Sequence, residues 1–256
     1  MSDILEEALK LPELNPFQIL KNGFSNNAGL RDDLETVMRT IVERHNPSDR
    51  AERFVYGGAC EWAMATACWV AGIHVFPAGH SQNGFDLTEY KDGLQGLWSV
   101  KSSAAAKPNG EIHLVNTIGP SSTPRHYVHP TIFLAPFLPG ITYFNPELAP
   151  GFASKIIYAQ DAIKLKQKIV LEFAERNPEY VIPFSMPINL GVPTEDPNLK
   201  IVFNILTSGT FSQLGPAIKN LKSISDKVGI FRNLYQDGQI TEEMFKKNLK
   251  EIEKNL

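Results

Sequence analysis

The chain has 256 residues, 43% of them apolar, and a formal net charge of -3. The apolar share is enough for a packed core, so we expect one large domain or a core with a small appendage. The slightly acidic net charge gives no overall basic signal for binding nucleic acid, although lysines and arginines can still gather in one cleft.

The first clear periodic pattern predicts a helix that begins after Asn26-Asn27 and ends at Asn46-Pro47. Its apolar positions recur at helical spacing and are Leu30, Leu34, Val37 and Ile41. Residues 1–7 lack the basic start and apolar core of a signal peptide. We therefore expect a cytoplasmic protein.

A long apolar run from Phe54 to Phe76 predicts a second helix, over Gly57 to Gly72. Glu61 is the only formally charged side chain in the run, and a carboxylate at mid-bilayer costs several kcal/mol, which argues against a membrane span. Cys60 and Cys68 lie eight residues apart. On one helix that spacing is about 12 Å, too far for a disulfide, so free thiols are expected.

Short runs of apolar and β-branched residues with turn residues between them predict several strands after this helix. Lys91-Asp92-Gly93 is typical of a hairpin turn. The expected strands are Ile73 to Phe76, Gly84 to Glu89, Gly96 to Ser102, Glu111 to Ile118 and Thr131 to Ala135. A helix followed by strands predicts an α/β (or α+β) fold with a mixed β-sheet flanked by helices.

Three short segments in this region carry side chains suited to phosphodiester chemistry. They are Glu61 on the second helix, Asp86 in Gly84-Phe85-Asp86-Leu87, and Ser99-Val100-Lys101. A nuclease must hold a divalent cation with hard oxygen ligands, generate hydroxide near neutral pH and neutralise charge at phosphorus. Alternation along a strand places Ser99 and Lys101 on one face, so both polar side chains can face one cleft.

The order of helix glutamate, aspartate and x-Val-Lys resembles the PD-(D/E)xK nuclease superfamily, and within it most of all the type II restriction endonucleases. The resemblance covers roughly residues 57 to 103. It implies a restriction-endonuclease-like core in which Asp86 is the central metal ligand. It further implies that Lys101 orients or activates the attacking water and that the backbone carbonyl of Val100 completes the metal shell.

By the same resemblance, the protein is expected to be a Mg²⁺-dependent deoxyribonuclease with one or two ions per active site. Its expected substrate is double-stranded DNA. A homodimer is expected because a palindromic site calls for two active sites related by two-fold symmetry. The resemblance also implies a cognate DNA methyltransferase in the same system.

Ser99 departs from the family pattern, because it stands where an aspartate or glutamate is expected and cannot supply an anionic oxygen. Two acids are candidates for the second metal ligand. Glu61 is isolated in apolar surroundings, where a carboxylate is costly unless it is paired or bound to metal. Glu111 lies downstream of Lys101 in Pro108-Asn109-Gly110-Glu111, a segment typical of an exposed turn. The sequence favours Glu61 and leaves Glu111 as the alternative.

Other interpretations of the same region remain open. Cys60 on its helix, with His113 as a base, resembles the thiol site of transglutaminase-like or papain-like hydrolases, in which a helix N-terminus lowers the thiol pKa. Asp86 and Lys101 could form an ion pair without catalysis. A noncatalytic DNA-binding module is the third alternative.

The rest of the chain offers weaker patterns. The loop after Pro120 contains Arg125 and His126, and these two residues together with Ser102 and Ser103 are candidate DNA contacts; the loop equally fits an ordinary surface connection. A helix is expected over Tyr158 to Arg176, with lysines that are either solvated or follow phosphates. These lysines are Lys164, Lys166 and Lys168.

At the C-terminus, a helical stripe from Leu214 to Ile224 is expected to stop near Gly229, and Thr241 is a good N-cap for a last helix. We expect a nuclease core with N-terminal helices over residues 1–210. A helical hairpin over residues 211–256 would then serve oligomerisation or packing.

Overall fold

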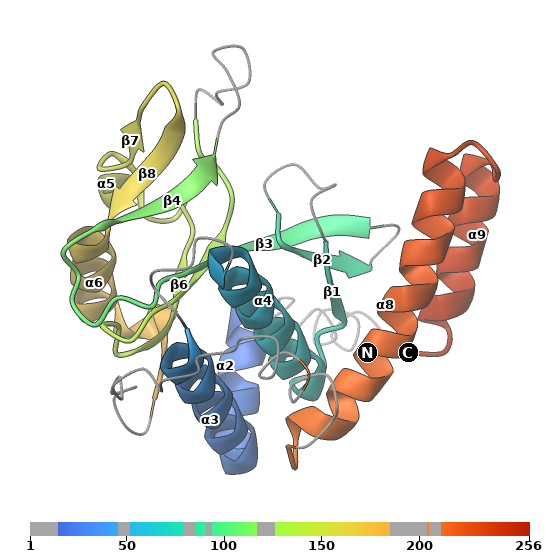
Figure 1. The fold of residues 1–256 in the computed structure, drawn as a ribbon, viewed down its shortest axis with the longest axis horizontal. Helices are drawn as coiled ribbons and strands as arrows, with labels where there is room; N and C mark the ends of the chain where they lie inside the picture. Colours follow the sequence, from blue (N-terminus) through green and yellow to red (C-terminus); the bar gives the residue numbers. More distant parts are fainter. Residues whose placement is uncertain are drawn as a thin grey trace, which may run out of the picture.

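A computed structural model describes residues 15–45, 52–78, 85–90, 94–116, 126–184, 204 and 211–256. The protein is a mixed α/β structure with a six-stranded sheet, a three-stranded sheet, N-terminal helices and a C-terminal helical segment (Figure 1). This architecture confirms the expected α/β class.

Three helices precede the sheet: α2 (Pro16–Asn26), α3 (Ala28–Arg44) and α4 (Glu52–Val70). The side chain of Asn27 accepts a hydrogen bond from the Leu30 backbone N–H at 3.1 Å, which caps α3 where the sequence predicted a helix start. Gly72 has a φ of +84°, a conformation that glycine adopts without strain. It therefore ends the α4 region where expected, although α4 begins before Gly57.

Both cysteines lie on α4, where they are buried and free, as predicted. Among the described helices, none combines the length and the apolar content needed to cross a bilayer.

The large sheet has the strand order β1-β2-β3-β5-β6-β9. Its strands are β1 (Val75–Pro77), β2 (Leu87–Tyr90), β3 (Leu94–Ser102), β5 (Thr131–Leu134), β6 (Gly140–Phe144) and β9 (Val181–Pro183). All neighbouring pairs are antiparallel except β3 and β5, which are parallel. Four of the five predicted strands belong to this sheet, and the predicted turn at residues 91–93 lies outside the described residues.

The small sheet has the order β4-β8-β7 and is followed by α6. Its elements are β4 (Glu111–Asn116), the short helix α5 (Pro150–Ala153), β7 (Ile157–Tyr158), β8 (Ala162–Lys166), α6 (Gln167–Arg176) and the 3-10 turn η2 (Pro178–Tyr180). The predicted helix over Tyr158 to Arg176 is therefore wrong in its first half. Within Ala162–Lys166, Leu165 is buried between the less buried Lys164 and Lys166, the period of a strand that pairs with β4.

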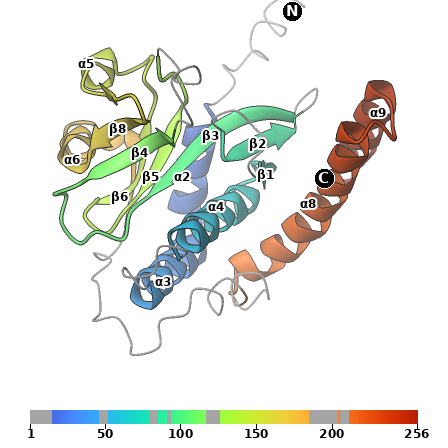
Figure 2. The same cartoon turned by 45° about the horizontal axis from the view of Figure 1, so that its top comes forward.

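Successive residues of the central strands divide between two apolar cores. On β5, Ile132 and Leu134 belong to a core shared with α2, α3, α4 and α8, whereas Phe133 belongs to a second core shared with β4, β8 and α6. Because side chains alternate across a strand, the large sheet is covered on both faces (Figure 2). The helices lie on one face, and the small sheet with α6 lies on the other.

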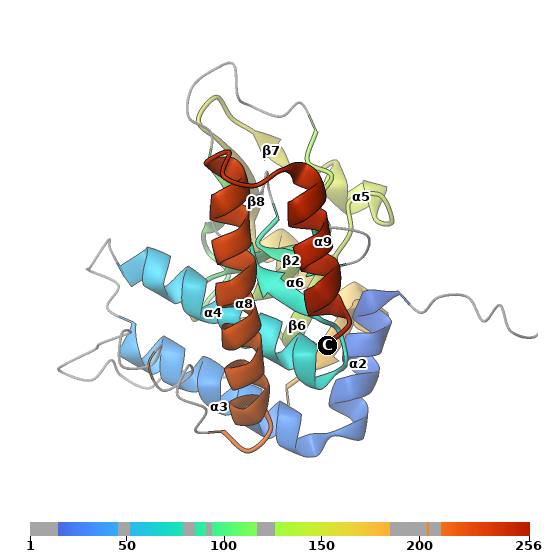
Figure 3. The ribbon, with the colours of Figure 1, turned by 90° about the vertical axis from the view of Figure 1, so that its right-hand side faces the viewer.

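Two long helices close the chain, α8 (Leu214–Gln236) and α9 (Glu242–Glu253) (Figure 3). The prediction that the first would stop at Gly229 is wrong, because α8 continues to a turn at Gly238, which has a φ of +69°. Val228, beside Gly229, is buried, and this packing outweighs the low helix propensity of one glycine. Thr241 caps α9 as predicted, accepting from the Met244 N–H at 3.2 Å.

A carboxylate on α3 holds the start of α8. One oxygen of Asp33 accepts hydrogen bonds from the backbone N–H groups of Gln213 at 2.6 Å and Leu214 at 3.1 Å. These donors have no partner inside the helix, and a negative charge there also meets the positive end of the helix dipole. Leu214 and Ile218 on this first part of α8 are buried in the core that α3 and α4 share.

Replacing Asp33 with alanine should lower the free energy of unfolding by about 1–2 kcal/mol, because it leaves the first N–H groups of α8 without this acceptor. Urea unfolding followed by circular dichroism measures the change. Asp32→Ala removes the same charge from the exposed neighbouring position and serves as the control. Equal stability of Asp33→Ala and Asp32→Ala would contradict the capping role.

Candidate active site

Asp86 lies immediately before β2, and one of its oxygens collects three hydrogen bonds from three successive residues of β3. Oδ2 accepts from Ser99 Oγ at 2.8 Å, from the Val100 backbone N–H at 2.7 Å and from Lys101 Nζ at 2.9 Å. The other oxygen, Oδ1, accepts no hydrogen bond from the described residues. The predicted partners Asp86, Ser99 and Lys101 are therefore brought together, with one carboxylate oxygen still available.

The backbone explains why the side chain of Asp86 meets this part of β3. Asp86 donates its N–H to the Trp98 carbonyl at 3.0 Å, and Ala78 donates its N–H to the Asp86 carbonyl at 2.8 Å. Backbone pairing of β2 with β3 reaches Leu87 opposite Trp98. Beyond that point the carboxylate takes the place of a backbone acceptor for Val100.

The Val100 carbonyl faces the same side as Asp86. On the β5 side of the strand, the backbone N–H of Ser99 donates a hydrogen bond to the Pro130 carbonyl at 2.8 Å. The backbone N–H of Ser103 donates to the Leu134 carbonyl at 3.0 Å. In a strand the N–H and C=O of one residue point to the same side, and successive residues alternate between the two neighbouring strands. The N–H and C=O of Val100 therefore both point away from β5. The Val100 side chain is buried in the core beneath α4, together with Trp98, as alternation predicted.

Ser99 is fully buried and serves Asp86 as a hydrogen-bond donor. The hydroxyl of Tyr127 lies near Ser99 and is 2.7 Å from Thr131 Oγ1. Burial raises the pKa of Tyr127 to about 12, so the phenol stays protonated at neutral pH. The neutral Ser99 hydroxyl therefore orients the carboxylate without adding charge to it.

Glu61 projects from α4 toward the same place. Burial, followed by the nearby charge of Asp86, raises the pKa of Glu61 to about 7, and Lys101 acts in the opposite direction. The side chain is half-buried, and no described residue forms a hydrogen bond or ion pair with it. Two carboxylates and one ammonium thus share a site in which Glu61 is held partly protonated at neutral pH.

This set of oxygens fits a hard divalent cation. Oδ1 of Asp86, the Glu61 carboxylate and the Val100 carbonyl are the types of ligand that Mg²⁺ takes in proteins, usually with several waters completing its shell. A cation would also relieve the repulsion through which Asp86 raises the pKa of Glu61. Within the described residues, no group of three or more His, Cys, Asp or Glu side chains could hold a metal ion, so any such ion would rest on two carboxylates and a backbone oxygen.

Glu111, the alternative second ligand, lies on β4 in the small sheet. Its side chain is 42% exposed, and its Oε2 is 3.9 Å from Lys164 Nζ, an ion pair across the β4–β8 ladder. Glu61, in contrast, is close enough to Asp86 and Lys101 for their charges to act on its pKa.

The candidate DNA contacts fall in different surroundings. Ser103 Oγ accepts hydrogen bonds from Ala105 N–H at 3.2 Å and from Gln167 Nε2 at 3.1 Å. Ser102 lies beside the Cys60 thiol and acts to lower its pKa. These two serines therefore have partners inside the protein. His126 is exposed, and Arg125 lies outside the described residues.

The surroundings of Cys60 do not favour thiol catalysis. Burial raises the pKa of Cys60 to about 12, and α4 begins at Glu52, well before the cysteine. A neutral thiol in mid-helix lacks the helix N-terminus that would stabilise a thiolate. His113 lies on β4 with an exposed side chain.

His129 lies beside the site, although no sequence pattern predicted it as a site residue. Its ring packs edge-on against Phe85 at 4.6 Å and against Tyr127 at 5.3 Å between ring centroids. Burial and then the charge of Lys101 lower the pKa of His129, while Asp86 opposes the shift. The alternation of Tyr127, His129 and Thr131 leading into β5 was the available signal for this face.

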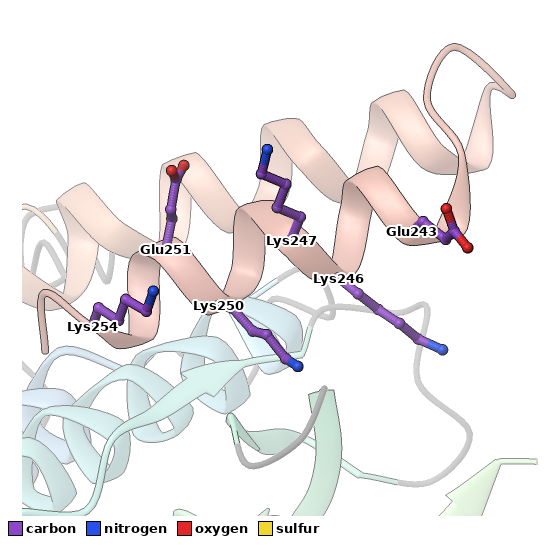
Figure 4. Close-up of a pocket in the computed structure, with 6 residues that line it drawn as sticks. All are labelled: Glu243, Lys246, Lys247, Lys250, Glu251 and Lys254. Atoms are coloured by element: carbon purple, nitrogen blue, oxygen red, sulfur yellow. The ribbon is translucent and has the colours of Figure 1, made fainter.

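A separate surface hollow of about 400 Å³ runs along α9. All six of its lining residues are charged: Glu243, Lys246, Lys247, Lys250, Glu251 and Lys254. Lys246 and Lys250 extend on one side of the helix, whereas Lys247 and Glu251 extend on another (Figure 4). None of these residues belongs to α4, β2 or β3, so the hollow is distinct from the carboxylate site.

Comparison of the chain with protein-family models, curated proteins and solved structures gave no match.

The raised pKa of Glu61 makes the stability of the metal-free protein depend on pH. The unfolded chain ionises this group near its ordinary pKa of 4.5, whereas the folded protein ionises it only near 7. The contribution of Glu61 to stability therefore falls as the pH rises through this window and is lowest above it.

Glu61→Gln should raise the free energy of unfolding at pH 8 by about 2–3 kcal/mol and change it little at pH 5. Urea unfolding in EDTA at both pH values measures the difference. Glu111→Gln, which removes a carboxylate from the exposed position on β4, is the control. A gain of the same size at both pH values would contradict the assigned environment of Glu61.

Proposed function

We propose that this protein is a Mg²⁺-dependent endonuclease that hydrolyses double-stranded DNA, with a core like that of type II restriction enzymes. The observation that carries the proposal is the Asp86 carboxylate, which Lys101 and two further donors of β3 hold by one oxygen, with Glu61 beside it. This arrangement joins cation ligands to a lysine in one place, as phosphodiester hydrolysis requires.

The path of the chain supports the same proposal. A helix bearing Glu61 packs on a sheet in which β1, β2 and β3 are antiparallel neighbours, followed by a parallel strand on the far side of β3. This is the helix-then-strands order that led us to expect a restriction-endonuclease-like core.

Each residue has a chemical role in the proposal. Asp86 Oδ1, Glu61 and the Val100 carbonyl would hold the cation, while Ser99 and the Val100 N–H fix the orientation of Asp86. Lys101 Nζ orients the attacking water and places positive charge beside the phosphate oxygens. A bound Mg²⁺ supplies Lewis-acid polarisation of the phosphate and a lowered pKa for coordinated water.

The reaction is the attack of water on phosphorus. The new P–O bond forms as the bond to the leaving sugar oxygen breaks, which leaves a phosphate on one end and, after protonation, a hydroxyl on the other. The side chains of Lys101 and Asp86 are 19% and 24% exposed, so both remain accessible to solvent and to a DNA strand. Cleavage of both strands at a palindrome would be served by a homodimer, and a cognate methyltransferase would protect the same sequence.

Asp86→Ala and Lys101→Ala should each reduce Mg²⁺-dependent cutting of duplex DNA by at least about 100-fold, because the first removes a cation ligand and the second the water-orienting ammonium. Digestion of a phage genome followed by sequencing of the ends measures activity and specificity together. Cys60→Ala should cut like the wild type, and EDTA should abolish cutting.

Normal cutting by Asp86→Ala would show that the site is wrongly assigned. If Cys60→Ala were inactive and EDTA had no effect, a thiol hydrolase would replace the nuclease. A wild-type protein that binds DNA but leaves it intact with every metal would be a noncatalytic DNA-binding module.

The second carboxylate ligand can be identified by a matched pair of substitutions. Glu61→Gln should reduce cleavage about 100-fold, since it removes an anionic oxygen beside Asp86, whereas Glu111→Gln should retain most of the activity. Cleavage rates across a Mg²⁺ titration make the comparison. The reverse result would assign the second ligand to the small sheet and leave Glu61 with a structural role.

A further inference from the structure

Arg232, on α8, contacts the strand ends that hold Asp86. Its Nη1 donates a hydrogen bond to the Ala78 carbonyl at 3.0 Å, although the two residues are 154 positions apart in sequence. Ala78 follows β1 directly, and its N–H donates to the Asp86 carbonyl at 2.8 Å. Two hydrogen bonds therefore connect the guanidinium of Arg232 to the backbone of Asp86.

These contacts continue the ladder between β1 and β2. Pro77 lies opposite Leu87 at the end of that ladder, so Ala78 and Asp86 form the next pair. Asp86 in turn donates its N–H to Trp98 on β3. The position of the Asp86 backbone is thus set from both sides, by β3 on one and by Ala78 on the other.

The environment of Arg232 is costly for a charged group. Its side chain is half-buried, burial lowers the pKa of its guanidinium, and its Nε is buried without a hydrogen-bond partner among the described residues. A guanidinium in such a place is expensive to desolvate, so a helix that needed only apolar packing would be better served by a leucine or methionine.

Arg232 also lies far from the other polar attachment of α8. The Asp33 contacts hold the beginning of the helix at Gln213 and Leu214, and Arg232 follows Leu214 by 18 residues. On a helix this separation is about 27 Å. The helix is therefore attached to α3 at one end and to the Asp86 region near the other.

We propose that Arg232 is a positioning residue of the active site: by holding the Ala78 carbonyl it keeps the Asp86 backbone in place for cation binding. This inference rests on the proposed function. It makes the C-terminal hairpin a part of the catalytic apparatus, acting through a backbone carbonyl and without touching the substrate.

The first test measures whether Arg232 stabilises the hydrogen bond between Ala78 and Asp86. In the full-length protein, Arg232→Met should speed amide exchange at Ala78 by about 10-fold, measured by NMR, and leave the amide of Phe133 on β5 unchanged. Lys227→Met, which removes one positive charge from an exposed position on the same helix, should change neither amide. Unchanged exchange at Ala78, or equal acceleration at Phe133, would overturn the proposal.

The second test follows the cation and the reaction. Arg232→Met should weaken Mn²⁺ binding, measured by electron paramagnetic resonance, by about 10-fold and raise the Mg²⁺ concentration for half-maximal cleavage by a similar factor. DNA affinity in Ca²⁺ should stay as in the wild type. Arg232→Lys, which keeps the charge and one donor, should give an intermediate effect.

Weaker DNA binding by Arg232→Met with unchanged Mn²⁺ affinity would show that Arg232 contacts phosphate, and the positioning role would be wrong. If the wild type cut no DNA, the proposed nuclease function would fail. The exchange and Mn²⁺ measurements would still decide whether Arg232 positions Asp86 for a cation.

Discussion

The convergence of three donors on one oxygen of Asp86 is the constraint on which the rest of the site depends. A serine hydroxyl, a backbone N–H and a lysine ammonium from consecutive positions of β3 all meet Oδ2. Alternation would normally send the middle residue to the opposite face. Val100 can therefore reach Asp86 only through its backbone N–H. This N–H is available because the backbone pairing of β2 with β3 ends beside it. The site therefore depends on the position at which the backbone pairing of β2 and β3 ends.

The charges of the site determine which ion it favours. Asp86 is stabilised by its donors, while Glu61 lies beside it without a described hydrogen bond and with a pKa raised to about 7. The single ammonium of Lys101 cannot satisfy both carboxylates at full charge. A divalent cation would do so, and this is the physical reason to connect the site with metal-assisted hydrolysis.

Local chemistry made much of the fold and the site predictable. Asn27, Gly72 and Thr241 mark helix ends through capping and backbone conformation, and alternation placed Ser99 and Lys101 on one face. The helix expected over Tyr158 to Arg176 is wrong only in its first half, where the apolar positions fit both periods and only pairing with β4 decides between them. The hydrogen bond from the Val100 N–H to Asp86 could not be predicted, because it does not depend on the Val100 side chain. The contact of Arg232 with Ala78 could not be predicted either, because it joins segments that are distant in sequence.

The parts of the large sheet on the two sides of β3 differ in how freely they can deform. Every residue of β5 and β6 is buried, so the half of the sheet that supports Lys101 has no solvent-facing side and little freedom to deform. Asp86 instead lies immediately before the short strand β2, which pairs with the edge strand β1. Any adjustment of the distance between the carboxylate and the ammonium is therefore made more easily at the Asp86 edge than at Lys101, and the hydrogen bond from Arg232 to Ala78 restrains that edge.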